Sequence, residues 1–224
     1  MTFNLSFLKL SLEAALPYIP VTLAIAAAPM ILGLLFGFVV ATIRVYRIPV
    51  ISQFLRFFVT VYSGIPDMVS LLLFNLIYIT QFPPVKWGGL AVVLITFTLD
   101  RIVQQSEAIR SAYLSIPRGQ YEAAYTCGFT EWQTLKKIIV PQVIPAALPP
   151  ITSHIVGAIK NTSIVMVVGV YDVLNGALKP CNDTYSFIEG YAAAALIFWV
   201  INAIVEFILS KTELKVTPGS KNKN

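Results

Sequence analysis

Long uncharged stretches recur along the chain and predict membrane-spanning helices. Ala14 to Ile43 contains 30 consecutive residues without Asp, Glu, Lys or Arg, and a helix needs about 20 apolar residues to cross the core of a bilayer. Apolar runs of similar length recur four more times. They are Phe57 to Thr80, interrupted near Pro66, then Trp87 to about Tyr113, about Pro150 to Tyr171, and Tyr191 to Leu209. We therefore expect an all-α integral membrane protein with five transmembrane helices.

The composition agrees with this pattern. Of the 224 residues, 57% are hydrophobic and only 12% are charged, and the mean hydropathy is +0.76. A typical soluble domain has about 25% charged residues, so these charges are too few to cover a water-soluble fold. A soluble enzyme and a nucleic-acid-binding protein are both excluded as leading interpretations.

The positions of the basic residues predict the orientation in the membrane, because Lys and Arg collect in cytoplasmic segments. With the N-terminus outside, twelve basic residues lie in inner segments and three in outer ones, leaving Arg101 within the third span. The C-terminus is then cytoplasmic, with a polar tail over 210–224. Cys127 falls inside and Cys181 outside, and their spacing indicates neither a disulfide nor a metal site.

The segment between the third and fourth spans has the pattern of a cytoplasmic helical hairpin, at about 117–141. Pro117 can open a helix, and Gly128 supplies the left-handed residue that ends one. Thr130 to Gln133 fits a capping box that starts a second helix, which we expect to end at Pro141. This second helix has three apolar residues on one face, namely Trp132, Leu135 and Ile139.

These hairpin residues resemble the EAA loop of the membrane subunits of ABC importers. The motif residues are Glu122-Ala123-Ala124, Gly128, Ile138 and Val140-Pro141, over 20 positions. The stretches IPRGQYEAA, VPQVIPAALPPI and KNTSIVMVVGV are similar to the polar amino acid uptake permeases of the histidine/glutamine type. The resemblance implies a MetI-like ABC permease fold, with one transmembrane domain over 1–224.

The resemblance also implies a function and a set of partners. The chain would be a permease subunit in a bacterial cell membrane, importing a polar amino acid or an amino-acid-like solute. Its hairpin would couple to a separate cytoplasmic ATPase through Glu122, Ala123, Ala124 and Gly128. A second permease subunit, identical or different, and an extracellular or periplasmic solute-binding protein would complete the importer. Because the chain has no GxxxxGK[ST] motif, ATP and Mg would be bound by the ATPase, and this chain would carry no cofactor and no catalytic residue.

Three stretches depart from the pattern of that family, all in the translocation half. Tyr62-Ser63-Gly64-Ile65-Pro66 stands where an R-G-T-P stretch is usual, and Phe97 to Gln104 differs from L-T-L-N-x-x-A-Y. The family's Lys-Asp-Thr-Ser is here Lys160-Asn161-Thr162-Ser163.

The third span carries the candidate substrate-pathway residues Asp100, Arg101, Gln104 and Gln105. An ionisable residue inside a membrane is costly unless it faces a partner or a wet cavity. Residues four apart share a helix face, which pairs Asp100 with Gln104 and Arg101 with Gln105. The cluster is either a polar patch that holds the charged backbone of an amino acid or an ion pair that fixes helix packing.

Other polar residues in the spans favour structural roles. We expect Glu107 and Arg110, one turn apart, to be structural, and His154 to be a hydrogen-bonded packing residue. Lys160 is expected to reach the interface or to pair with a neighbouring helix. Gly33 and Gly37 form a GxxxG pattern that allows close helix contact.

Two other functional classes remain open. An ion-gradient-driven secondary carrier would use Asp100 and His154 as coupling groups, but five spans give no inverted repeat. A non-transporting membrane scaffold would explain the hairpin but not the charges within the span. Co-purification with an ATPase subunit distinguishes these classes from a permease.

Overall fold

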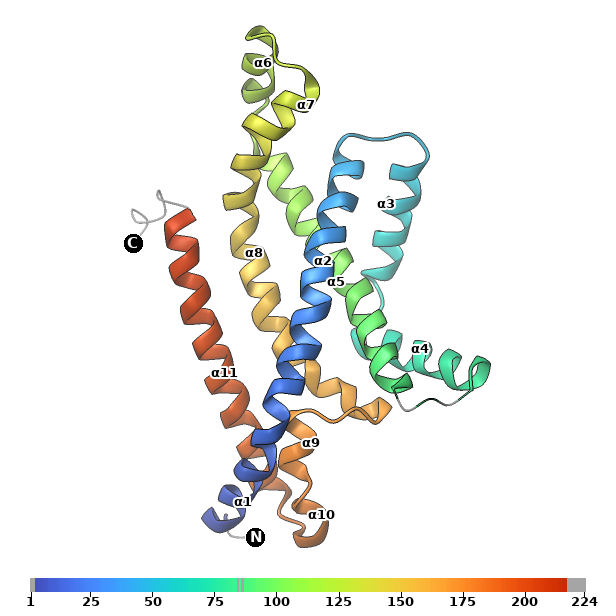
Figure 1. Cartoon of the computed structure of the whole chain (residues 1–224), viewed down its shortest axis with the longest axis vertical. Helices are drawn as coiled ribbons and strands as arrows, with labels where there is room; N and C mark the ends of the chain where they lie inside the picture. The colour runs from blue at the N-terminus through green and yellow to red at the C-terminus, as the bar shows by residue number, and fades with distance from the viewer. Residues whose placement is uncertain (1–2, 84, 86, 217–224) are drawn as a thin grey trace. The chain divides into compact units, whose positions relative to one another are not determined.

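The computed structural model describes residues 3–83, 85 and 87–216, and every regular element among them is helical (Figure 1). The predicted all-α class is confirmed. The chain divides into two compact units, unit 1 comprising 1–31, 65–100 and 155–206, and unit 2 comprising 32–64, 101–154 and 207–224. Four long helices, α2 (Ile19–Val45), α5 (Gly88–Ser115), α8 (Val140–Asn161) and α11 (Phe187–Val216), contribute sections to both units.

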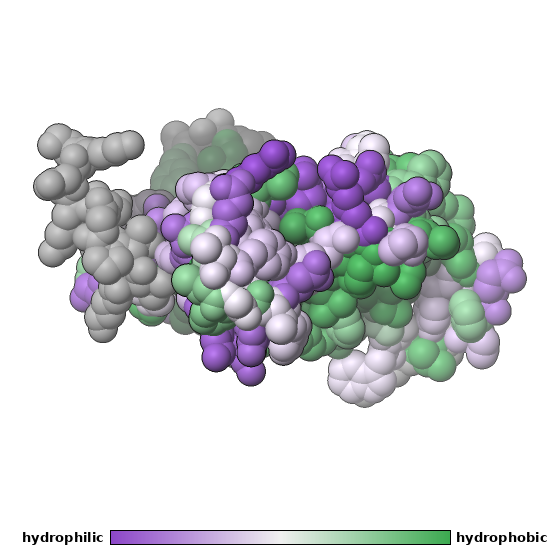
Figure 2. All heavy atoms as spheres, turned by 90° about the horizontal axis from the view of Figure 1, so that it is seen from above, coloured by the Kyte–Doolittle hydropathy of each residue, from purple (hydrophilic) through white to green (hydrophobic). Residues whose placement is uncertain are grey.

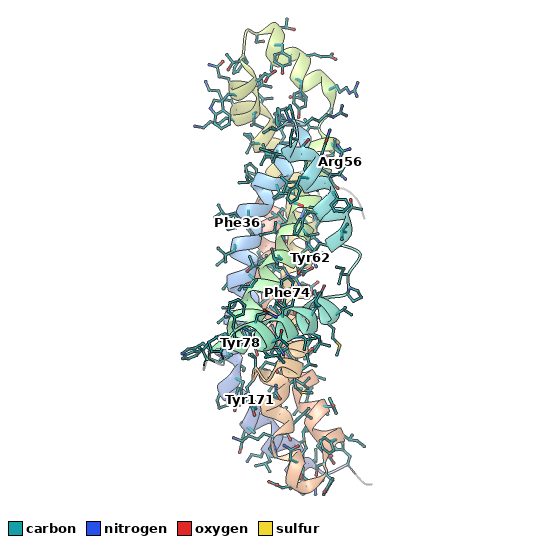
Figure 3. The ribbon with its side chains drawn as sticks, turned by 90° about the vertical axis from the view of Figure 1, so that its right-hand side faces the viewer. Phe36, Arg56, Tyr62, Phe74, Tyr78 and Tyr171 are labelled. Atoms are coloured by element: carbon teal, nitrogen blue, oxygen red, sulfur yellow. The ribbon has the colours of Figure 1, made fainter. Side chains whose placement is uncertain are left out.

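Unit 1 adds several shorter elements to its sections of the long helices. They are α1 (Leu5–Ala15), η1 (Leu16–Tyr18), α4 (Asp67–Gln81), η3 (Thr162–Val168), α9 (Val173–Leu178) and α10 (Cys181–Thr184). Its core is an apolar cluster of Ile25, Leu71, Val92, Val93, Phe97 and Val165. Phe74 and Tyr78, labelled on α4 in Figure 3, pack against this cluster. The helices of unit 1 are therefore held together by burial of apolar side chains.

Polar contacts fix the short elements of unit 1 in place. Asn4 caps α1 with its side chain, and its backbone N–H donates to Glu189 Oε1 at 2.7 Å. The backbone N–H of Val173 donates to Thr22 Oγ1 at 3.0 Å, which ties α9 to α2. Cys181 is fully buried, so this thiol of the predicted outer loop is not at the surface.

Unit 2 contains α3 (Ile51–Tyr62), α6 (Arg118–Thr126), α7 (Glu131–Thr134) and η2 (Leu135–Ile139), beside its sections of the long helices. Its core combines α2, α5, η2 and α8. The buried members are Ala41, Ile109, Ala112, Tyr113, Leu135, Ile139, Val143 and Ala147. Because Leu135 and Ile139 belong to this cluster, the second arm of the hairpin is anchored in the same core as the long helices.

The predicted end of the second hairpin helix at Pro141 and the predicted start of the fourth span near Pro150 are both wrong. Helix α8 begins at Val140, is 22 residues long, and runs through Pro145, Pro149 and Pro150 to Asn161. Pro141 lies in its first turn, where a missing N–H costs little. Each later proline removes one hydrogen bond, while the flanking bonds and the packing of Val143 and Ala147 hold the helix together.

Within the described part of the chain, three helical stretches are long and apolar enough to cross a membrane, and a fourth qualifies if α3 and α4 are one broken span. The three are Leu5–Val45, Glu131–Val168 and Phe187–Glu213. The predicted interruption near Pro66 is confirmed, because α3 ends at Tyr62 and α4 begins at Asp67. The predicted helix through Asp100 and Arg101 is also confirmed, as α5. Because of its polar residues, α5 is not among the three stretches that are apolar enough to cross a membrane.

The fifth predicted span lies within α11, which continues to Val216. The first seven residues of the predicted polar tail are therefore helical, and 217–224 lie outside the described residues.

Candidate functional site

The hairpin begins with α6, whose ends match the sequence prediction. Pro117 is its N-cap, and the helix ends in a left-handed turn at Gly128, which has φ +78°. The N–H of Gly128 donates to the carbonyl of Tyr125 at 2.9 Å, and the N–H of Phe129 donates to that of Ala124 at 3.0 Å. These bonds satisfy carbonyls that would otherwise be unpaired at the helix end. The reversal of the chain is thus fixed by backbone geometry that favours glycine.

The second arm starts at the predicted capping box. Thr130 Oγ1 accepts from the N–H of Gln133 at 3.3 Å, and the N–H of Thr130 donates to Gln133 Oε1 at 2.9 Å. The helix α7 then passes into η2, a π-helical turn, before α8. Gln142 on α8 donates to Gln120 on α6 at 3.2 Å, so a side-chain hydrogen bond joins the two arms. The second arm of the hairpin, made of α7 and η2, therefore continues directly into α8.

The predicted apolar face of the second arm is only partly correct. Leu135 and Ile139 are buried in the unit 2 core, whereas Trp132 is 68% exposed. The π-helical turn changes the angular spacing of side chains, and Trp132 lies before it, at the end of the hairpin away from the core. The prediction therefore grouped one surface residue with two core residues.

The four candidate coupling residues fall into two groups. Glu122, Ala123 and Gly128 are exposed, while Ala124 is 2% exposed and faces the interior. Tyr125 is 51% exposed and lies beside them on α6. Viewed from above, hydrophilic side chains gather over this end of unit 2 (Figure 2). The surface available to a partner is thus polar with aromatic positions at Tyr125 and Trp132.

The loop after α2 approaches the hairpin within unit 2. Burial, together with the neighbouring hydroxyls of Tyr121, Tyr113 and Tyr125, raises the pKa of Tyr46 to about 12. Burial likewise raises the pKa of Tyr121. These tyrosines therefore remain neutral at physiological pH and contribute hydrogen-bonding groups, not charge, beside the hairpin.

The polar face of α5 in unit 2 packs against the glycines of α2. A Cβ atom at Gly33 would overlap the Cβ and backbone of Arg101, and one at Gly37 would lie 2.9 Å from Gln105 Cβ. The predicted close contact at the GxxxG pattern is confirmed. Arg101 and Gln105 share this face, as their four-residue spacing predicts, and both are buried.

The side chains of these two residues reach polar partners beyond the helix contact. Arg101 Nη1 donates to Gln104 Oε1 at 2.9 Å, and Gln105 Oε1 lies 3.4 Å from His154 Nδ1. The hydrogen-bonded role expected of His154 is confirmed. Gln104 and His154 also line an open cavity of ≈ 400 Å³ together with Ser63, Glu107 and Ser111. Of the four candidate pathway residues, Gln104 is the one that lines this cavity, while Asp100 is buried in unit 1.

Glu107 is the centre of a three-residue ion network. It accepts from Arg44 Nη1 of α2 through Oε1, and from Arg110 Nε and Nη2 through Oε2 at 3.1 and 3.0 Å. The Arg44 side chain is 7% exposed and that of Glu107 is 37% exposed, so the pair is partly shielded from solvent and links α2 to α5 by charge-assisted hydrogen bonds. The structural role expected of Glu107 and Arg110 is supported, and Arg44 is the partner that sequence spacing did not identify.

One departure from the permease pattern, Asn161, contacts in unit 1 the residue that directly follows another, Asp67. Asn161 Nδ2, at the end of α8, donates to Asp67 Oδ2, in the first turn of α4, at 2.7 Å. Asn161 occupies the position where the resembling family has Asp. The carboxylate is thus supplied from α4, a relationship that was not apparent from either stretch separately.

Among the described residues, no group of three or more His, Cys, Asp or Glu side chains is arranged to hold a metal ion. The exposed residues of the hairpin and the Glu107 network offer surfaces for docking and ion pairing.

Comparison with known proteins gives relatives along nearly the whole chain. The probable amino-acid ABC transporter permease protein PatM of Vibrio harveyi is 29% identical, over 96% of this chain and 97% of its own length. The probable amino-acid permease protein YxeN of Bacillus subtilis is 28% identical, over 92% of this chain and 93% of its own.

Solved structures agree with the sequence relatives. A crystal structure of an amino acid ABC transporter with histidines has a TM-score of 0.82 at 26% identity, covering 96% of this chain and 100% of that chain. An inward-facing MetNI methionine ABC transporter has a TM-score of 0.71 at 18% identity, covering 88% and 93%, and shows the shared fold.

The model of a permease family matches residues 33–217, which include the hairpin and the polar face of α5. The predicted MetI-like fold is confirmed by these likenesses. The chain is a non-catalytic permease subunit of an ABC importer, and it belongs to the family described as the binding-protein-dependent transport system inner membrane component.

Proposed function

We propose that this chain forms the membrane pathway for a polar amino acid, or an amino-acid-like solute, in an ATP-driven bacterial importer. Relatives over more than nine-tenths of the chain are named as amino-acid permeases, and one is named as a probable glutamine permease. These names support a solute with an amino-acid backbone and do not select one amino acid.

The observation that carries the proposal is the doubly capped hairpin at the end of α8. Its tip presents Glu122, Ala123, Tyr125 and Trp132, while Leu135 and Ile139 anchor its base in the unit 2 core. An element that is exposed at its tip and rigid at its base transmits a displacement to the helix that carries it. We infer that the tip docks on a separate cytoplasmic ATPase, which binds ATP and Mg.

Alternating access requires that the ATPase favour one state of the permease over the other through differential contacts. Within the hairpin, Gly128 sets the angle between the arms, Glu122 and Ala123 meet the ATPase, and Ala124 packs inside. As a member of the EAA triplet, Ala124 was expected to contact the ATPase. Its side chain is only 2% exposed and offers no surface to a partner, so we assign it to the core of the hairpin instead.

The proposed topology has five spans in one permease domain over 1–224, crossing the bacterial plasma membrane. The N-terminus lies outside and the C-terminus inside. Helix α5 is the third span, and its polar residues are accommodated because Arg101 and Gln105 pack against α2 and Glu107 pairs with Arg44. A second permease subunit, identical or different, and an extracellular or periplasmic solute-binding protein complete the importer.

Co-purification followed by transport tests the proposal. A tagged chain is isolated from its native membranes with its associated subunits, and uptake of labelled amino acids into reconstituted vesicles is measured with ATP inside. We expect an ATPase in the complex and uptake that requires ATP hydrolysis. Uptake that follows an ion gradient without ATP would instead identify a secondary carrier, and a complex without any uptake would identify a scaffold.

A further inference from the structure

A hollow in unit 1 brings together opposite charges from two helices. It is a cavity of ≈ 340 Å³ between the end of α8 and the middle of α11, lined by Lys160 from α8 and by Trp199, Asn202 and Glu206 from α11. Glu206 falls within the stretch predicted as the fifth span and was not among the predicted substrate-pathway residues.

The two charged side chains of this hollow are not neutralised by the part of the chain that the structure describes. Lys160 and Glu206 are both exposed, and neither forms an ion pair with the described residues, so the neighbouring-helix pair expected for Lys160 is not formed there. A charged side chain that faces lipid within a span is costly. Two opposite charges at one hollow therefore favour a hollow that faces water or a bound polar group.

Asn202 gives independent support for a ligand. Its side chain is 7% exposed, and its Nδ2 donates to the carbonyl of Phe198 at 2.8 Å, which fixes the orientation of the amide. Its Oδ1 is buried without any hydrogen-bond partner. A buried acceptor left unpaired is costly, and the residue that carries it lines the hollow.

We infer that this hollow binds the backbone of a zwitterionic α-amino acid, an inference that rests on the proposed function and locates its substrate. The Lys160 ammonium holds the carboxylate, and the Glu206 carboxylate holds the α-ammonium beside Asn202. Trp199 and Phe198 contact the substrate side chain. A neutral sugar would leave both protein charges unpaired, and a simple anion would leave Glu206 unpaired, so the charge pattern selects a molecule with both signs.

The assignment differs from the pathway predicted at Asp100, Arg101, Gln104 and Gln105. Arg101 and Gln105 are occupied by packing against α2 and by hydrogen bonds. Lys160 and Glu206 form no ion pair with the described residues, which makes them the stronger binding groups.

Equilibrium binding to the purified complex of permease and ATPase, without solute-binding protein, tests the site. The probe is a ¹⁴C-labelled mixture of L-amino acids. We expect Lys160→Met and Glu206→Gln each to weaken binding about ten- to a hundredfold, because each removes a charge-assisted contact, and Asn202→Leu to weaken it about tenfold. Unlabelled amino acids should compete, whereas their N-acetyl and methyl ester derivatives should not.

Matched exchanges outside the hollow serve as controls. Lys179→Met and Glu213→Gln remove the same charges elsewhere and should leave binding unchanged. Lys160→Arg and Glu206→Asp keep the charges and should retain measurable binding, which separates loss of the site from loss of the fold.

The outcomes that overturn the inference are distinct. Normal binding by Lys160→Met and Glu206→Gln, in a complex that imports an amino acid, would remove this site while the proposed function stands. Loss of a second permease subunit from the variant complexes would identify the hollow as a subunit interface. Failure of the unmodified complex to bind or import any labelled amino acid would remove the proposed substrate class together with the site.

Discussion

Gly33 in α2 lies directly against Arg101 in α5, and the space for a side chain at Gly33 is filled by the Cβ and backbone of that arginine. The contact explains how a charged residue is accommodated in a predicted membrane span. Its stem is covered by the α2 backbone, and its guanidinium reaches Gln104 on its own helix. Gly37 repeats the contact one turn later, against Gln105 and Ser106.

This contact predicts that Gly33→Ala destabilises the protein. The added methyl has backbone atoms as neighbours, so the helices must separate, at a cost of about 1–3 kcal/mol. The matched control is Gly157→Ala in α8, where nothing lies within 4 Å of the new Cβ and the helix should gain about 0.5–1 kcal/mol. Thermal unfolding in detergent measures both. Equal midpoints for the two variants would contradict the close packing at Gly33.

The hydrogen bond between Asn161 and Asp67 predicts a conditional effect of Asn161→Asp. This exchange restores the residue of the resembling family but places two carboxylates at 2.7 Å, so we expect a loss of about 1–3 kcal/mol in stability. Adding Asp67→Asn should recover most of the loss, because one carboxylate and one amide are again paired. A double-mutant cycle on unfolding midpoints checks this, and additive effects would show that the pair is not coupled.

The left-handed turn at Gly128 predicts a graded set of coupling variants. Gly128→Val should strain the hairpin by about 1–2 kcal/mol through the backbone alone, since nothing lies within 4 Å of a Cβ there. We expect solute-stimulated ATP hydrolysis and uptake to fall sharply while membrane insertion is normal.

Gly128→Asn is the matched control, because asparagine adopts left-handed backbone more readily, and it should retain most of the activity. Glu122→Lys reverses a charge at the proposed docking surface and should reduce uptake without altering the hairpin. Unmodified uptake in both Gly128→Val and Glu122→Lys would remove the coupling role from this hairpin.

The proposed orientation predicts which thiols an impermeant maleimide reaches in intact cells. Cys127 is exposed but lies on the proposed cytoplasmic side, and Cys181 is fully buried. The unmodified protein should therefore stay unlabelled until the cells are permeabilised, when Cys127 reacts. Asn182 is exposed beside Cys181, so Asn182→Cys in a Cys127→Ser background should react in intact cells. Labelling of Cys127 in intact cells would reverse the topology.

Asp172 predicts a dependence of stability on pH. It is fully buried and caps α9 by accepting from the N–H of Asn175 at 3.1 Å. Burial raises the pKa of its carboxyl, against opposing hydrogen bonds from Asn175 and Leu174. The folded state therefore holds the proton more tightly than the unfolded chain, whose carboxyl has a pKa of about 3.9.

The contribution of Asp172 to stability is then fully present below the unfolded pKa and is lost as pH rises through the raised, folded value. Asp172→Asn keeps a capping side chain that does not titrate, so its unfolding midpoint should vary less with pH over the weakly acidic range. Midpoints measured across that range compare the two proteins, and parallel curves would exclude Asp172 as the group responsible.

Local signals along the chain were enough to predict the class of this protein, because the membrane imposes an apolar composition on the helices that cross it and helix ends require particular residues. Uncharged runs predicted the long helices, and the capping box at Thr130 and the left-handed Gly128 predicted the hairpin within a few residues. These signals depend on neighbours along the chain, so no tertiary information was needed to read them.

Tertiary structure decided which polar residues are occupied and which are available. Arg101 and Gln105 were candidates for substrate binding by residue type, but the glycines of α2, far away in sequence, cover them. Arg44 and Asp67 gained their roles from partners more than sixty residues distant, at Glu107 and Asn161. Continuous packing likewise allowed α8 to run through its prolines. A side chain's chemical type is local, whereas the burial and pairing that decide its role are set by segments that meet only after folding.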